Sequence, residues 1–192
     1  MQAFRSLLEL LFMLATDVRI VVLFALLSIA AVTDCRSYRI PNWLTMGGAL
    51  CGLAYGALAG AWSGLGLAVA GLLVGFLTLV PFYVLGVMGA GDVKLMAMVG
   101  AFLGIPGIAY AVLSTFIVGG VLALAVIVGR GLLSRTLGNV KVLVQTMSLS
   151  VLGGIRPDMR LEAHRSVGKL PYGVSIALGA MGYVVAHQIG YL

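Results

Sequence analysis

Long apolar runs, separated by short polar or glycine-rich segments, dominate the pattern along the chain. Most of the runs approach the roughly 20 residues that a helix needs to cross the hydrocarbon core of a membrane. The fourth run is shorter, so we expect it to form a short or tilted crossing. The pattern therefore predicts an all-α, polytopic membrane bundle of about six transmembrane helices. The expected crossings are residues 18–33, 41–61, 65–84, 94–103, 108–128 and 171–192.

Two segments depart from this pattern. Residues 1–17 place apolar side chains at helical spacing, with Arg5 and Glu9 on the opposite face, which predicts an interfacial amphipathic helix. A cleaved signal peptide is the alternative, although the segment has one arginine and no clear A-x-A site. Residues 129–170 are polar and predict a long loop, in which 138–152 is a candidate interfacial helix. We expect residues 1–192 to form a single membrane-embedded domain.

Composition supports the membrane assignment. Hydrophobic residues make up 61% of the chain and charged residues only 9%, against about a quarter charged in soluble domains. The mean hydropathy is +1.14. These values exclude a soluble enzyme, a nucleic-acid-binding domain and a disordered tail, because a water-soluble domain of this length could not bury so much apolar surface.

Glycine and cysteine add two further points. The chain has 27 glycines, and small residues allow membrane helices to pack closely. Five of them recur every fourth residue and predict a smooth packing stripe: Gly48, Gly52, Gly56, Gly60 and Gly64. The two cysteines, Cys35 and Cys51, form no CxxC pair and indicate neither a disulfide framework nor a zinc site.

The basic residues predict the orientation. If the crossings alternate, residues 34–42, 85–93 and 129–170 lie on one face, and that face, with Lys94 at its edge, holds ten of the twelve lysines and arginines. Positive residues concentrate on the cytoplasmic side of membrane proteins. We therefore expect these three segments, including the loop 129–170, to be cytoplasmic and the N-terminus to lie outside.

Two aspartates stand at predicted membrane borders. Asp34 closes the first crossing and Asp92 opens the fourth, so two crossings separate them and they must share one face. A pair of carboxylates can hydrolyse a peptide bond when one is ionised and the other protonated, a mixed state favoured when like charges lie close together. Gly89 and Gly91 would let an extended substrate strand approach closely. The alternative is structural, with Asp92 as a helix cap and Asp34 as an interfacial anion beside Arg36.

These residues, taken together and in order, resemble the prepilin peptidase family, whose members are G-x-G-D aspartic proteases of the inner membrane. The similarity is greatest to the short tight-adherence (Flp) type and the archaeal preflagellin type. The resemblance rests on Asp34 with Arg39-Ile40-Pro41-Asn42 and Leu44-Thr45, on Gly89-Ala90-Gly91-Asp92-Val93-Lys94-Leu95, and on Pro171-Tyr172-Gly173.

The resemblance implies an endopeptidase that cleaves the short basic leader of a prepilin or pseudopilin on the cytoplasmic side, with Asp34 and Asp92 in the catalytic roles. Longer members carry a cytoplasmic insertion with paired CxxC motifs and also methylate the new N-terminus. Here only about seven residues separate Asp34 from the second crossing, so the resemblance does not extend to methylation.

Three further polar residues are candidates for substrate binding or support of the site. Lys94 could tune Asp92 or bind substrate, or could simply reach toward water as an interfacial lysine. Arg39 fits either a substrate contact or a topology signal, and Asn42 either a helix cap or a contact to the substrate backbone. No metal ion or cofactor is expected. The expected partners are the prepilin substrate, membrane lipid and proteins of a pilus or secretion assembly, without nucleic acid. A non-catalytic membrane scaffold or a small transporter is the alternative function.

Overall fold

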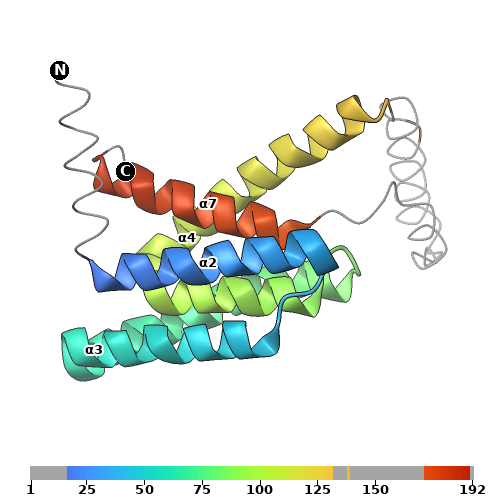
Figure 1. Ribbon diagram of the computed structural model, residues 1–192. Helices are drawn as coiled ribbons and strands as arrows, with labels where there is room; N and C mark the ends of the chain where they lie inside the picture. The colour runs from blue at the N-terminus through green and yellow to red at the C-terminus, as the bar shows by residue number, and fades with distance from the viewer. Residues whose placement is uncertain (1–16, 132–137, 139–170, 191–192) are drawn as a thin grey trace, which may run out of the picture. The chain divides into compact units, whose positions relative to one another are not determined.

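The computed structural model describes residues 17–131, 138 and 171–190, and these form an all-helical structure (Figure 1). The interfacial helix expected over 1–17 therefore falls almost wholly outside the described residues, as does nearly all of the loop expected over 129–170. The four helices are α2 (Val18–Ser37), α3 (Asn42–Val84), α4 (Ala90–Gly129) and α7 (Tyr172–Gln188). Three of them, α2, α3 and α4, are long and apolar enough to cross a membrane, so the chain is an all-α membrane protein.

Six separate spanning helices were expected, whereas the described part of the chain has four helices, of which α3 and α4 are each divided by a non-helical break. The connections expected at 61–65 and 103–107 fall at or beside these breaks, so α3 and α4 each consist of two helical segments joined by a sharp turn. In α3 the break falls at Gly60 and Ala61, whose backbone angles (φ −135°, ψ 18° and φ 47°, ψ −130°) are not helical. In α4 it falls at Gly104 (φ 69°, ψ −176°), where glycine accepts a positive φ without a steric penalty.

The break in α3 folds the helix back on itself. A straight helix of 43 residues would be about 65 Å long, twice the thickness of a hydrocarbon core. Instead Gly56 lies against Gly64 and Ala68, eight and twelve residues further along, which requires a reversal of direction. Figure 1 shows both halves of α3 running side by side.

Glycines bring the helices into close contact, as the sequence pattern predicts for Gly48, Gly52 and Gly56. A Cβ at Gly48 would collide with Met98, and one at Gly52 would meet Ala101 and Phe102 at 3.0 Å. The second half of α3 approaches α4 backbone to backbone, at Gly71 and Gly100. These contacts surround a core to which α2, α3, α4 and α7 all contribute. Its largest fully buried side chains include Leu23, Leu27, Leu44, Leu79, Leu95, Met96, Met98, Ile108 and Ile176.

Four helix ends meet at one end of this core. The last turn of α2 is followed by Tyr38, whose left-handed backbone (φ 50°, ψ 33°) ends the helix, and Pro41 then precedes the first residue of α3. The first turns of α4 and α7 lie beside this link, where Gly91 and Gly173 both contact Ile40. Because Asp34 and Asp92 belong to two of these helix ends, the fold brings both carboxylates to the same end of the core.

Candidate active site

Asp34 lies in the last turn of α2 and is only 5% exposed. Its Oδ2 accepts a hydrogen bond of 2.7 Å from the backbone N–H of Gly173, in the first turn of α7. The first N–H groups of a helix have no partner within the helix, and its dipole favours negative charge at this end. The N-terminus of α7 therefore stabilises the ionised carboxylate of Asp34.

Asp92 lies in the first turn of α4 and is 7% exposed. Its Oδ2 accepts a hydrogen bond of 2.9 Å from the N–H of Gly89, as the acidic residue of a capping box does. The structural role expected as the alternative is thus present, since Asp92 caps its own helix. Capping does not require burial, however, and burying a carboxylate costs free energy. Capping alone therefore does not explain why Asp92 is buried.

Ile40 connects the two aspartates through the glycines beside them. A Cβ at Gly91 would lie 3.2 Å from the Cβ of Ile40, and a Cβ at Gly173 would lie 2.9 Å from its Cδ1. The side chain of Ile40 therefore packs against the residue before Asp92 and against the residue that binds Asp34. Asp34 and Asp92 are therefore both next to residues that pack on Ile40, at the same end of the core.

Lys94 and Asn42, two separate candidates in the sequence, contact each other. The Nζ of Lys94 donates a hydrogen bond of 2.9 Å to the Oδ1 of Asn42, which ties the N-terminal part of α4 to the start of α3, two residues after Asp92. Asn42 is the first residue of α3, which has no side-chain cap, so capping is not the role of its amide. Arg39 is exposed, and its side chain has no hydrogen bond to any described residue.

Two residues of the site, Gly173 and Ile40, were given no role from the sequence, although both belong to the motifs that carry the resemblance. A signal for Gly173 exists in the sequence, because a residue that follows Pro171 at the start of a helix has a free N–H group to offer. No comparable signal marks Ile40, an apolar residue in a short polar link. Over the described ranges, no three histidine, cysteine or acidic side chains come together where they could hold a metal ion, and Cys35 and Cys51 are both exposed and free.

Comparison with known proteins indicates the family to which the chain belongs. A sequence model of the type IV leader peptidase family matches residues 21–124, which include both Asp34 and Asp92. Neither the curated proteins nor the solved structures contain a match. The matched segment is more than half of the chain and runs from α2 through most of α4. The chain therefore belongs to the type IV leader peptidase family and is a membrane peptidase.

Proposed function

We propose that this protein is an aspartic endopeptidase of a bacterial or archaeal cytoplasmic membrane that removes the leader from Flp-type prepilins or pseudopilins, with Asp34 and Asp92 as the catalytic pair. The observation that carries the proposal is the site at the meeting helix ends. Two buried carboxylates lie there together, and a backbone N–H holds one oxygen of each. In this role the protein would serve the assembly of a pilus or a secretion system.

The proposed reaction is general acid–base hydrolysis. One aspartate, ionised, takes a proton from water while the water oxygen bonds to the scissile carbonyl carbon. The other aspartate, protonated, gives its proton to the carbonyl oxygen. When the tetrahedral intermediate collapses, the C–N bond breaks, the leaving amine receives the proton taken from water, and a hydroxyl of the intermediate returns a proton to the second aspartate as the carbonyl re-forms. The backbone hydrogen bonds to Gly89 and Gly173 would hold both carboxylates in place through these steps.

The residues around the pair suggest supporting roles. Gly89 and Gly91 would leave room for an extended substrate backbone next to Asp92. The hydrogen bond between Lys94 and Asn42 would keep the N-terminal part of α4, and with it Asp92, at a fixed position relative to the start of α3. Arg39, exposed on the link between α2 and α3, would contact either the substrate or the lipid headgroups.

The proposal includes a topology of six crossings with the site facing the cytoplasm. The turns within α3 and α4 would divide the four described helices into six crossings, and the charge distribution would orient them. A reporter fused after Arg156 should report a cytoplasmic location, and a matched fusion after Ser63, in the turn of α3, should report the opposite side. A periplasmic reading after Arg156 would contradict the proposed orientation.

The proposed activity can be tested by co-expressing the protein with the prepilin genes of the same genome and following leader removal as a gel shift. We expect cleavage to proceed in strong chelators and in the presence of serine- and thiol-directed reagents, because neither a metal nor a side-chain nucleophile takes part. A bulky adduct on Cys35 could block the neighbouring Asp34, so a Cys35→Ser protein is the matched control for the thiol reagent. Loss of cleavage in chelator, restored by zinc, would contradict the mechanism.

A further inference from the structure

A pocket with a charged lining residue lies at the end of the helices opposite to the two aspartates. This pocket, of about 380 Å³, opens between the turn of α3, the turn of α4 and the beginning of α2. Its walls are glycines and apolar side chains of α3 and α4, and among the described residues Arg19 of α2 is its one charged lining residue, so we call it the Arg19 pocket. Arg19 and Asp34 are fifteen residues apart on α2, about 22 Å along the helix, so the pocket is remote from the aspartates.

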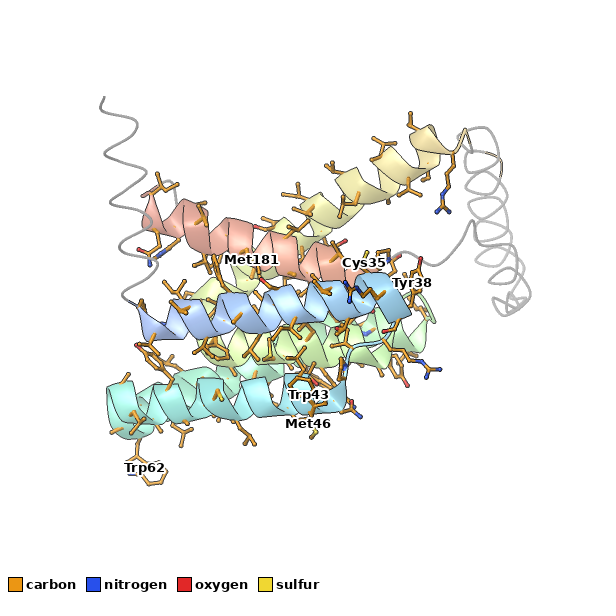
Figure 2. All side chains as sticks on the ribbon, viewed as in Figure 1. Cys35, Tyr38, Trp43, Met46, Trp62 and Met181 are labelled. Atoms are coloured by element: carbon orange, nitrogen blue, oxygen red, sulfur yellow. The ribbon has the colours of Figure 1, made fainter. Side chains whose placement is uncertain are left out.

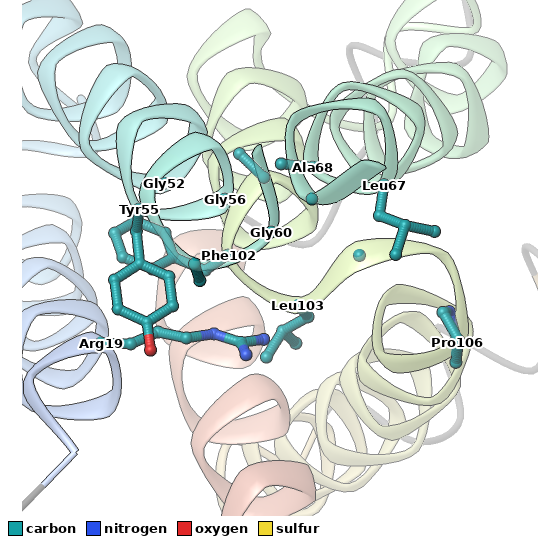
Figure 3. A pocket seen from close by; sticks show the side chains of 14 residues that line it. Arg19, Gly52, Tyr55, Gly56, Gly60, Leu67, Ala68, Phe102, Leu103 and Pro106 are labelled. Atoms are coloured by element: carbon teal, nitrogen blue, oxygen red, sulfur yellow. The ribbon is translucent and has the colours of Figure 1, made fainter. Parts of the chain in front are cut away.

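Arg19 is positioned to use this space. Figure 3 shows its side chain extending along the pocket beside the ring of Tyr55, with the guanidinium next to Leu103. The Cζ of Arg19 lies 5.8 Å from the centre of the Tyr55 ring, within the range of a cation–π contact. The aromatic ring orients the guanidinium, whose N–H donors have no hydrogen-bond partner among the described residues and suit an oxygen anion. Charge complementarity therefore calls for an anionic group in the pocket.

The expected position of the pocket, at the level of the lipid headgroups, indicates which molecule supplies the anionic group. The helical first half of α3 is about 27 Å long, close to the thickness of a hydrocarbon core. The two tryptophans of the chain mark its ends, Trp43 at the start and Trp62 in the turn, 68% and 86% exposed. Tryptophan side chains prefer the level of the lipid headgroups. Figure 2 shows Trp62 extending outward from the turn of α3.

The pocket borders on surface that faces lipid. Leu58, beside lining residue Ala59, is 88% exposed, and the lining residue Leu67 is 55% exposed. In a membrane protein such side chains contact acyl chains. A molecule that places an anion on Arg19 and apolar chains along these residues is a phospholipid. We propose that the Arg19 pocket binds the phosphodiester headgroup of an anionic phospholipid.

The test uses the full-length protein in detergent and native mass spectrometry with phosphatidylglycerol, and phosphatidylcholine of the same acyl chains as the comparison. The wild type should retain one phosphatidylglycerol in clear preference to phosphatidylcholine. Arg19→Gln should weaken this retention about tenfold, the effect of one charge-assisted hydrogen bond to phosphate. Arg36→Gln removes the same charge from the other end of α2 and should leave retention unchanged.

A second variant separates shape from charge. Ala59→Phe keeps the guanidinium but fills the pocket from an exposed helix position, so it should also lose the lipid. Normal retention by either Arg19→Gln or Ala59→Phe would overturn the proposal. Effective competition by free glycerol phosphate would indicate a site for soluble anions and would overturn it too. If Arg19→Gln lowered the melting temperature equally with and without phosphatidylglycerol, the partner of Arg19 would belong to the chain itself, which would also contradict the proposal.

Discussion

Asp34→Asn and Asp92→Asn should each reduce prepilin cleavage by on the order of 10³-fold or more, since removing one member of a catalytic unit disables the whole unit. The amide oxygen of asparagine can still accept the hydrogen bonds from Gly173 and Gly89, so the helix cap and the packing are preserved. The double substitution should be no worse than either single one, because effects within one unit do not add. The measurement is the ratio of mature to uncleaved pilin, at equal amounts of membrane-inserted protein.

Asp158→Asn and Glu162→Gln are the matched controls, since they make the same chemical changes in the predicted loop 129–170. Both should leave cleavage near the wild-type level. Robust cleavage by either aspartate variant would favour the structural interpretation, in which Asp92 only caps α4 and Asp34 is an interfacial anion. A non-catalytic scaffold would tolerate the loss of either carboxylate, and no cleavage would be seen even with the wild type.

Gly173→Ala should produce the second largest loss, at least tenfold in cleavage rate, even though alanine is the better helix former. The new Cβ would lie 2.8 Å from the Oδ2 of Asp34 and 2.9 Å from the Cδ1 of Ile40. Contacts this short force a displacement, and the carboxylate and Ile40 are the groups that must move. Small misplacements of a catalytic group cost large factors in rate. The measurement is the cleavage rate of the purified variant, together with its melting temperature.

Gly182→Ala is the control on the same helix, because a Cβ there meets nothing within 4 Å. It should cleave at the wild-type rate. If Gly173→Ala cleaved normally while remaining folded, the hydrogen bond between Gly173 and Asp34 would have no part in catalysis.

The location of both aspartates at the same end of the core was predictable from the sequence, because it depends only on the number of crossings between them. Apolar runs identify crossings, and an even number of crossings between Asp34 and Asp92 returns the chain to the same face. The start of α3 after Pro41 and that of α7 after Pro171 were predictable too, since proline suits the beginning of a helix. These features depend on local chemistry and periodicity.

The breaks within α3 and α4 were predictable in position, since the connections expected at 61–65 and 103–107 lie beside Gly60–Ala61 and at Gly104. The apolar pattern did not predict how abrupt these breaks are, since Gly60 and Ala61 alone carry the non-helical backbone angles in α3. The hydrogen bond between Gly173 and Asp34 joins residues 139 positions apart. It depends on how α2 and α7 pack, a property of the tertiary structure that local patterns do not contain.

The interaction of Lys94 with Asn42 illustrates the same limit. Each was a candidate on its own, as a tuning or snorkelling lysine and as a capping amide. The structure pairs them, and a pair 52 positions apart cannot be inferred from either neighbourhood. Sequence reasoning identified the polar residues of the site but not their partners.

Two aspartates at the meeting helix ends are proposed to hydrolyse a prepilin leader, and reconstitution tests this most directly. Purified wild type, Asp34→Asn and Asp92→Asn are placed in liposomes with a synthetic prepilin, in chelator, and the products are identified by mass. We expect one cut by the wild type, between the basic leader and the apolar segment, and no product from either variant at the same melting temperature. A product from either variant, or none from folded wild-type protein, would contradict the proposed mechanism.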